Sequence, residues 1–484
     1  MEVLPVIPKR FKFARGVTWL FLALSMLLLV YTYYRAEFIY DGKGYEKYFK
    51  YYVISLAGVL FWGTVLWLKD EIKLKITMAS TSLVVGIYLV EITLHFLVLS
   101  SQPTYAEIAA ELAAKEGNEF DMRTKLQVVK DMRREGVDAF PLFHPDLVIA
   151  TNGVPGSKPL FPLSGISNKY LVSCNESGKY AVNLSDRFGF NNPDSEWDSP
   201  KTEWLFVGDS FTYGACVQPG EEIPAQVRIM TGENVLNLGM HGSGPLSELA
   251  VLQEYAKPRQ PKKVIWVYFP NDSVNLTDEI SAPLLMSYLQ EEFSQRLIHR
   301  QTEIDNRLKK FIMEATVKYE KKLELGKVYR EKHPYLLETK ILRLGHIREQ
   351  IGFDRLRNRA LGYPKEVMNP LFSEILTKAR DRVASWGGKL YFVYLPTGNR
   401  YLKDTRSSDL PWNPSEIIGV AKNLNIPVID IHQEVFANHP DPFSLYPLRI
   451  GTHLNAGGYS EVAKAIVLGV TGEQKSRKTI DEGD

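Results

Sequence analysis

The most informative part of this chain is the stretch Trp204-Leu205-Phe206-Val207-Gly208-Asp209-Ser210-Phe211-Thr212-Tyr213-Gly214. Its first four residues are apolar and predict a buried strand, which ends at the Gly-Asp-Ser that follows. We expect a helix to begin there, so that the Ser210 hydroxyl lies at the carboxyl edge of a sheet, where open α/β folds bind ligands. The flanking glycines permit a tight turn, and a helix N-terminus offers N–H groups to a negative charge.

Apolar runs and helical stretches alternate after Trp204, which is typical of a parallel sheet with helices on both faces. The expected strands are Trp204–Val207, Asn234–Leu238, Lys263–Phe269, Lys389–Leu395 and Ile426–Ile431. Residues 275 to about 369 form a gap far too long for a crossover, and their apolar residues lie near helical spacing. We therefore predict an α/β domain over residues 201–472 with a helical cap inserted at about 275–369, followed by a polar tail at 473–484.

Composition excludes several classes of protein. The formal net charge is only +2, so the molecule as a whole is not built to bind nucleic acid. Its two cysteines, Cys174 and Cys216, exclude a disulfide-rich scaffold and disfavour a cysteine metal site, and we expect neither a metal nor a cofactor. Outside the cytoplasm the two could form a disulfide, and two unrelated buried thiols are the alternative.

Three apolar stretches lie within residues 1–100, at about 17–34, 51–68 and 76–99, each long enough to cross a hydrocarbon core. No small-residue cleavage site follows the first, so we expect three retained transmembrane helices with the lipid bilayer as their partner. Basic residues precede the first stretch and separate the second from the third. They favour a cytoplasmic location for the N-terminal region and for this loop. By parity, everything after about residue 100 is expected on the periplasmic side of a bacterial inner membrane.

Two features lie near the boundary between the membrane helices and the rest of the chain. Glu91 and His95 stand four residues apart on one face of the third stretch. An ionisable pair inside a membrane is a functional candidate, and a paired contact between helices is the alternative. Residues 101–200 begin as a charged and alanine-rich helical stalk and continue as a segment rich in turn residues, which predicts short strands.

Three segments fall where chemical partners of Ser210 would be needed, at two strand ends and at the start of the last helix. They are Asn237-Leu238-Gly239-Met240-His241-Gly242, Asn271-Asp272 and Thr452-His453-Leu454-Asn455. Acyl transfer to a serine requires a base, for which histidine is suited near neutral pH, and fixed donors for the oxyanion. The N–H groups of Ser210 and Gly242 and the side-chain amide of Asn271 are three such donors.

Together these blocks resemble the SGNH (GDSL) hydrolase superfamily, which is named for its Ser, Gly, Asn and His residues. The resemblance covers about residues 203–470 and implies a flavodoxin-like three-layer parallel sheet. It implies that Ser210 is the nucleophile and His453 the base. By the same resemblance, Ser210, Gly242 and Asn271 form the oxyanion hole, with Gly239 as the alternative to Gly242.

One position departs from the family pattern. Members commonly carry an aspartate three residues before the histidine to orient its ring, and this chain has Ile450 there. Either a Ser–His dyad operates or another acid substitutes, and Asp430 and Asp441 are the candidates that we identify. Loss of the orienting acid lowers the rate by orders of magnitude. The missing aspartate at position 450 is therefore also compatible with a domain that has lost catalysis.

The resemblance implies a membrane-anchored serine esterase that acts outside the cytoplasm on acylated carbohydrate. Acetyl groups on cell-surface or secreted polysaccharide are the expected substrate. If a sugar hydroxyl replaces water, the same residues make an O-acyltransferase, and the sequence does not separate the two. A catalytically weak polysaccharide-binding or assembly protein and a lipid-directed hydrolase are two further interpretations of the same residues. We also expect a membrane-protein partner.

Overall fold

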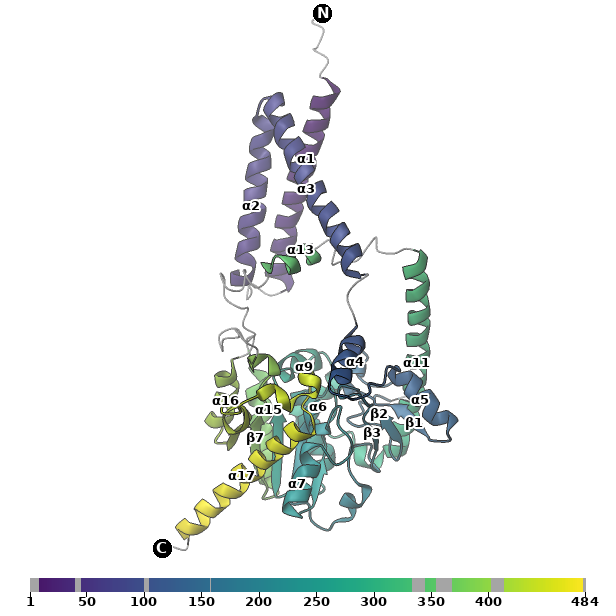
Figure 1. Cartoon of the computed structure of the whole chain (residues 1–484). Helices are drawn as coiled ribbons and strands as arrows, with labels where there is room; N and C mark the ends of the chain where they lie inside the picture. The colour runs from purple at the N-terminus through teal and green to yellow at the C-terminus, as the bar shows by residue number, and fades with distance from the viewer. Residues whose placement is uncertain are drawn as a thin grey trace, which may run out of the picture. The chain divides into compact units, whose positions relative to one another are not determined.

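The computed structural model describes residues 8–39, 45–99, 104–156, 158–332, 344–353, 368–401 and 413–481 of the chain (Figure 1). The chain divides into two units. The first comprises Met1–Gln102 with Tyr335–Leu356, and the second Pro103–Pro334 with Arg357–Asp484. The insertion between the strands thus contributes residues to both units.

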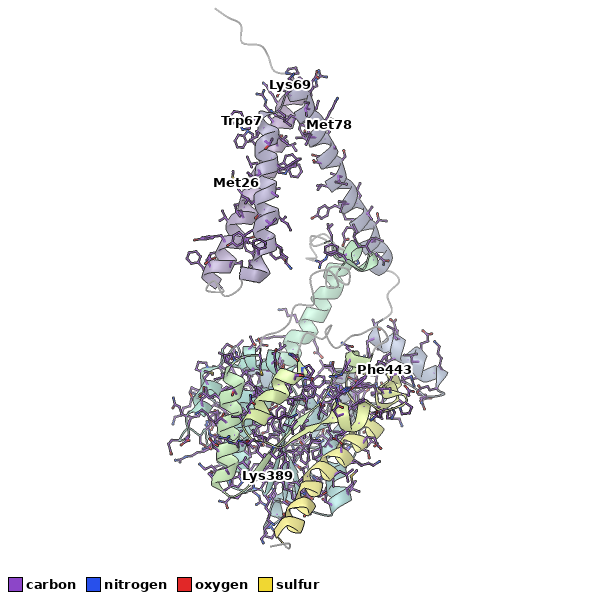
Figure 2. All side chains as sticks on the ribbon, turned by 90° about the vertical axis from the view of Figure 1, so that its left-hand side faces the viewer. Met26, Trp67, Lys69, Met78, Lys389 and Phe443 are labelled. Atoms are coloured by element: carbon purple, nitrogen blue, oxygen red, sulfur yellow. A yellow bond between two sulfur atoms is a disulfide. The ribbon has the colours of Figure 1, made fainter. Side chains whose placement is uncertain are left out.

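Three long helices make up most of the first unit: α1 (Lys9–Tyr33), α2 (Tyr45–Trp67) and α3 (Asp70–Leu99), with a π-helical continuation of α1, η1 (Tyr34–Ile39). All three are long and apolar enough to cross a membrane, which confirms the three expected stretches, although each helix begins several residues earlier than predicted. Large apolar side chains are exposed along them, including Met26, Trp67 and Met78 (Figure 2). Exposed apolar side chains of this kind suit a hydrocarbon environment.

Glu91 contacts a segment that lies far away in the sequence. Its carboxylate is fully buried and accepts hydrogen bonds from the N–H groups of His346 (2.9 Å) and Ile347 (2.8 Å), at the start of the short helix α13 (Gly345–Gln350). At 1.5 Å per residue, Glu91 lies about 31 Å along α3 from Asp70, close to the thickness of a hydrocarbon core. A paired helix contact near the far end of α3 therefore accounts for Glu91. The side chain of His95 lies outside the described residues.

The second unit is built on a five-stranded parallel sheet in the order β5-β4-β6-β7-β8. Its strands are β4 (Trp204–Gly208), β5 (Val235–Asn237), β6 (Lys263–Tyr268), β7 (Lys389–Tyr394) and β8 (Val428–Asp430). In chain order this arrangement is 2-1-3-4-5, the flavodoxin-like topology that the resemblance implies. Every predicted strand is present, and the last is shorter than its apolar run.

Side chains of successive residues in a strand enter two different cores, one on each face of the sheet. Leu205 and Val207 share one core with the layer formed by α8 (Pro245–Val251), α15 (Leu371–Ser385) and α16 (Pro414–Asn423). Trp204 and Phe206 belong to the other core, with α7 (Ile223–Thr231) and α17 (Ala456–Asp481). The three-layer prediction is confirmed, and the expected polar tail is mostly a continuation of α17.

Residues 104–199, which we call the accessory segment, pack as part of the second unit. Its elements are α4 (Tyr105–Lys115), α5 (Lys125–Arg134), β1 (Ala139–Pro141), η2 (Pro145–Val148), β2 (Tyr170–Val172), β3 (Val182–Leu184) and η3 (Asp194–Asp198). The three strands form a small sheet in the order β1-β2-β3. Phe143, Phe161 and Phe190 are buried in the same core as Leu205, so this segment shares the core of the sheet domain and is more than a stalk.

The first part of the insertion after β6 packs on the accessory segment. It contains α9 (Asp272–Glu279), α10 (Pro283–Met286), η5 (Ser287–Leu289), η6 (Leu297–His299) and α11 (Gln301–Lys332). Asp305 accepts hydrogen bonds from the N–H (2.9 Å) and the Oγ (2.6 Å) of Ser167. The short elements of the second unit are α6 (Ser210–Tyr213), η4 (Leu252–Ala256), η7 (Gly398–Tyr401), η9 (His432–Phe436), η10 (Pro442–Leu445) and η11 (Pro447–Arg449).

A disulfide between Cys174 and Cys216 ties the accessory segment to the sheet domain across 42 positions of sequence. The double substitution Cys174→Ser/Cys216→Ser should lower the free energy of unfolding by about 4 kcal/mol, because the unfolded chain regains the entropy of that loop. Heat unfolding of the detergent-solubilised full chain, followed by tryptophan fluorescence, measures the change. Reductant should destabilise only the wild type, and equal midpoints for both proteins would contradict the bridge.

Substitution Glu91→Ala should free the first turn of α13, because two N–H groups lose a charged acceptor. Hydrogen exchange at His346 and Ile347 should become roughly 10- to 100-fold faster. Mass spectrometry of the 344–353 region in detergent checks this. Glu71→Ala, an exposed glutamate at the start of α3, is the matched control. Unchanged protection in Glu91→Ala would rule out the contact.

Candidate functional site

The turn after β4 places Ser210 at the carboxyl end of the sheet. Gly208 has φ +155°, and a Cβ built on it would overlap Thr212 Oγ1 and lie 2.7 Å from the Val267 carbonyl oxygen, so only glycine fits. Asp209 caps α6 by accepting a hydrogen bond from the Phe211 N–H at 2.9 Å. Ser210 begins that helix and is 9% exposed. The local sequence thus fixes both the turn and the position of the hydroxyl.

His453 meets Ser210 from the loop before α17. Its Nε2 lies 3.0 Å from Ser210 Oγ, and its ring centroid lies 5.0 Å from that of Phe211. Asn455 holds the loop in place: its Oδ1 accepts from the Gly458 N–H (2.9 Å) and its Nδ2 donates to the Ser444 carbonyl (2.8 Å). The structure therefore brings together the two residues that the resemblance pairs.

Glu176 occupies the position of the orienting acid. Its Oε1 lies 2.9 Å from His453 Nδ1, and its Oε2 accepts from the N–H groups of Thr452 (2.9 Å) and His453 (3.0 Å). Thr452 Oγ1 donates to the same carboxylate at 2.5 Å. Burial alone would raise the pKa of Glu176, but the hydrogen bonds from His453 and Thr452 outweigh it and hold the pKa below its usual value. An ionised carboxylate here makes His453 Nδ1 the donor and leaves Nε2 free to accept.

The two acids suggested by the sequence lie elsewhere, and that expectation is corrected. Asp430 ends β8 and accepts a hydrogen bond from the His432 N–H at 3.0 Å. Asp441 forms an ion pair with Arg449 at 2.6 Å. The acid comes instead from the accessory segment, 277 positions before His453. Ile450 can therefore stand where the family has aspartate without leaving the imidazole unsupported.

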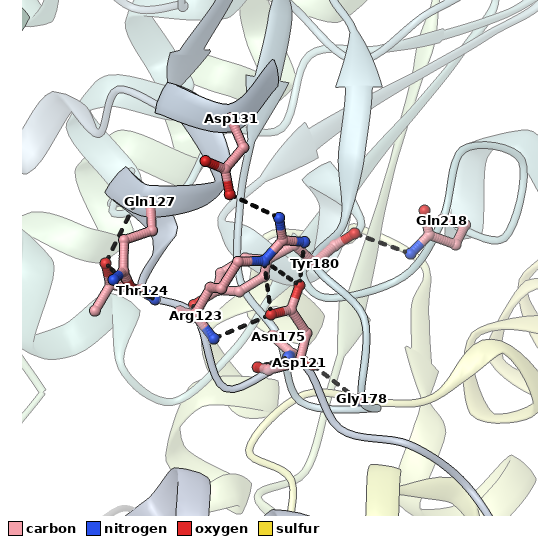
Figure 3. A network of polar contacts seen from close by, with 9 residues as sticks. All are labelled: Asp121, Arg123, Thr124, Gln127, Asp131, Asn175, Gly178, Tyr180 and Gln218. Carbon is pink, nitrogen blue, oxygen red and sulfur yellow. Dashed lines mark hydrogen bonds and ion pairs between the residues drawn. The ribbon is translucent and has the colours of Figure 1, made fainter. Parts of the chain in front are cut away.

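A network of polar contacts fixes the loop that carries Glu176 (Figure 3). Asn175 Nδ2 donates to the Asp121 carbonyl (3.0 Å), and its Oδ1 accepts from the Gly178 N–H (2.8 Å). The Asp121 N–H donates to the Gly178 carbonyl at 2.8 Å. Tyr180 OH donates to the Arg123 carbonyl at 2.7 Å. The connection between α4 and α5 thus holds both sides of this loop, and the Cys174 disulfide anchors its start.

Three donors lie at the ends of β4, β5 and β6. Among the described residues, no hydrogen bond to a backbone acceptor is found for the N–H groups of Ser210 and Gly242. The alternative, Gly239, donates its N–H to Asn237 Oδ1 at 3.0 Å and is therefore engaged. Burial raises the pKa of Asp209, and the Phe211 N–H and the nearby side chain of Asn271 oppose that rise. Asn271 is thus held beside the turn that carries Ser210.

One group of side chains in the described residues has the spacing of metal ligands: Cys174, Cys216 and His453. The two sulfur atoms are bonded to each other, so they offer no thiolate. His453 Nδ1 lies 3.7 Å from Cys216 Sγ and faces the Glu176 carboxylate at 2.9 Å. This group is therefore a disulfide beside an imidazole that is hydrogen-bonded to a carboxylate.

The sequence interpretation missed Glu176, which stands in a turn-rich loop without periodicity. The cysteine pair is the feature of the sequence that could have indicated Glu176. Cys174 lies two positions before Glu176, and Cys216 follows Ser210 within the same loop region. A disulfide between them brings Glu176 into the neighbourhood of Ser210 and His453.

No family model and no curated protein sequence matches this chain. Solved structures of GDSL lipases and esterases are similar to a little over half of it. A lipolytic protein of the G-D-S-L family from Desulfitobacterium hafniense DCB-2 has 12% identity over 56% of this chain and 99% of its own, with a TM-score of 0.28. The lipase/acylhydrolase from Enterococcus faecalis has 13% identity over 56% and 97%, with a TM-score of 0.30.

A third similar structure is Axe2, an acetylxylan esterase from Geobacillus stearothermophilus. It has 14% identity over 56% of this chain and 94% of its own, with a TM-score of 0.28. This chain is thus similar to GDSL lipases and esterases, and it carries the Ser, Gly, Asn and His blocks of their superfamily on a flavodoxin-like sheet.

Proposed function

We propose that this protein is a membrane-anchored serine esterase of SGNH type that removes acetyl groups from polysaccharide on the periplasmic side of a bacterial inner membrane. The observation that carries the proposal is the line of contacts from Ser210 Oγ to His453 Nε2 (3.0 Å) and from His453 Nδ1 to Glu176 (2.9 Å). The line lies at the switch point between β4 and β6, where parallel sheets of this order bind ligands. The polysaccharide substrate and the periplasmic placement come from the sequence expectations.

Acylation begins with proton transfer from Ser210 Oγ to His453 Nε2 as Oγ bonds to the acyl carbon of the ester. The carbonyl oxygen becomes an oxyanion, which the N–H groups of Ser210 and Gly242 and the Asn271 amide stabilise. The Glu176 carboxylate stabilises the imidazolium that forms and keeps its ring oriented. His453 then returns the proton to the departing sugar oxygen, and the ester C–O bond breaks.

Deacylation repeats these steps with water as the nucleophile. His453 takes a proton from the water as its oxygen bonds to the acyl carbon, and the same donors stabilise the second oxyanion. The proton then passes to Ser210 Oγ as the acyl-enzyme bond breaks, which releases acetate. If a sugar hydroxyl replaces water, the same steps transfer the acetyl group to that sugar.

The non-catalytic interpretation rests on Ile450. It is weakened because Glu176 supplies a carboxylate in place of the family's aspartate, which this chain lacks. The closely packed ring of Phe211 and the two backbone N–H bonds to Glu176 also restrict how His453 can turn. A preorganised base of this kind favours an enzyme over a binding protein.

Substitution Ser210→Ala should reduce hydrolysis of p-nitrophenyl acetate at least about 10³-fold, because the acyl-enzyme cannot form. The assay uses the detergent-solubilised full chain, and a fluorophosphonate probe should label Ser210 in the wild type only. Ser444→Ala, which lies on the His453 loop and donates to the Asp441 carbonyl, is the matched serine control. A wild type that neither cleaves the ester nor takes the label would refute the proposal.

Hydrolysis and transfer are separated by the fate of the acetyl group. With acetylated xylan as donor, the proposed esterase should release one acetate for each ester lost, measured by coupled acetate detection and by NMR of the polymer. Added oligosaccharide acceptor should leave that ratio at one. Acetate release well below ester loss, with new acetyl signals on the acceptor, would identify an O-acyltransferase instead.

Substitution Glu176→Gln should lower kcat roughly 10²- to 10⁴-fold with little change in KM. Either orientation of the new amide turns its NH₂ group against a donor, at His453 Nδ1 or at the N–H groups of Thr452 and His453. The ring is therefore driven to the wrong tautomer or displaced. Asp430→Asn and Asp441→Asn are matched controls and should retain the wild-type kcat. If either control loses activity while Glu176→Gln retains it, the assignment of the acid is wrong.

A further inference from the structure

A second carboxylate, from Asp146, lies beside the candidate oxyanion hole. A Cβ built on Gly242 would lie 2.7 Å from both Cγ and Oδ1 of Asp146 and 3.1 Å from its Oδ2. Gly242 has φ +72°, which favours glycine, and the carboxylate fills the space that a side chain would need. Asp146 belongs to η2 of the accessory segment, so a second acid from that segment reaches the ends of the strands.

The described residues offer this carboxylate no partner that would explain it. Among the described residues, the N–H groups of Leu147 and of Asp146 itself are the groups that favour its charged form, and no lysine, arginine or histidine contributes. Asp146 as a whole is exposed, but its carboxyl faces the strand ends, where partial burial and the neighbouring Asp278 raise its pKa. Its negative charge is thus poorly compensated by the protein.

Histidine rings connect the neighbourhood of Asp146 with the proposed catalytic base, His453. The ring of His144 lies 5.0 Å from that of His241, and His241 lies 6.2 Å from His453. His241 is buried, and its Nε2 lies 3.4 Å from Ser173 Oγ. Burial and the charge of Lys125 lower the pKa of His144 to about 4. Burial lowers the pKa of His241 as well, so neither His144 nor His241 carries a positive charge near pH 7 that would compensate Asp146.

A carboxylate beside an oxyanion hole opposes the charge that develops there, so it costs catalysis unless it binds something. Sugar hydroxyls next to an esterified carbon would donate to it, and a hydrogen bond to a charged acceptor is among the stronger ones. A sugar that carries its own carboxylate would be repelled. The position therefore suits an uncharged sugar with free hydroxyls beside the acetyl group.

We propose that Asp146 is a specificity-determining residue that accepts hydrogen bonds from the hydroxyls of an uncharged acetylated sugar and disfavours uronic acid esters. This inference rests on the proposed esterase function and adds the class of sugar to it. It predicts that removal of the charge affects different esters in opposite directions. A purely structural role would change all of them together.

The test compares Asp146→Asn with the wild type, as detergent-solubilised full chains, on three acetyl esters. For a monoacetylated methyl xyloside, kcat/KM should fall roughly 10- to 100-fold, because the charged acceptor is lost. For p-nitrophenyl acetate, which has no hydroxyls to bind, kcat should rise roughly 2- to 10-fold as the opposing charge disappears. For a monoacetylated methyl glucuronoside, kcat/KM should rise as well. Asp198→Asn, a surface aspartate paired with Arg187, is the matched control and should change none of the three.

Each outcome separates this inference from the function on which it rests. A wild type inactive on p-nitrophenyl acetate and unlabelled by fluorophosphonate refutes the esterase itself. An active wild type whose Asp146→Asn variant falls equally on all three esters, or changes on none, overturns the role of Asp146 and leaves the esterase standing. A wild type that cleaves p-nitrophenyl acetate but neither sugar ester also overturns it. If Asp146→Asn fails to fold, Asp146→Ser provides the same comparison.

Discussion

The contact between the Glu176 carboxylate and His453 Nδ1 is the interaction on which the site depends. At 2.9 Å it fixes which ring nitrogen carries the proton, and so which nitrogen faces Ser210. The carboxylate is itself fixed by two backbone N–H groups on the histidine loop and by Thr452 Oγ1. Because these donors belong to the same loop as His453, the carboxylate and the imidazole are held by one set of bonds.

This arrangement makes the accessory segment part of the site. The sheet places Ser210, Gly242 and Asn271 at the ends of three neighbouring strands, as its topology requires. Glu176 lies outside the sheet, on a loop held by the disulfide of Cys174 and by the contacts of Asp121 and Arg123 (Figure 3). A sheet domain without this segment would keep the serine and histidine and lose the group that orients them.

Sequence patterns predicted the parts of the structure that depend on local order. The strand before Ser210 is a run of apolar residues that ends in glycine, and the other strands are also apolar runs. The sheet and the position of its carboxyl edge could therefore be predicted. Glu176 could not be predicted in this way, because a loop has no period and the contact joins positions 277 apart. The insertion shows a related limit. Helical spacing identified its helices, but it could not indicate that α13 packs on α3 through Glu91.

The disulfide connects the chemistry of the site to its compartment. Cys174 lies two positions before the acid, and Cys216 Sγ lies 3.7 Å from the imidazole that the acid orients. Disulfides persist outside the cytoplasm and are rare within it, so the support of Glu176 is complete only in an oxidising environment. The parity of the three apolar helices and the basic residues near their ends favour the outer side for the same domain. The disulfide, through bond chemistry, and the helices, through charge and parity, are thus the two arguments behind the proposal that this site lies on the outer side of a membrane.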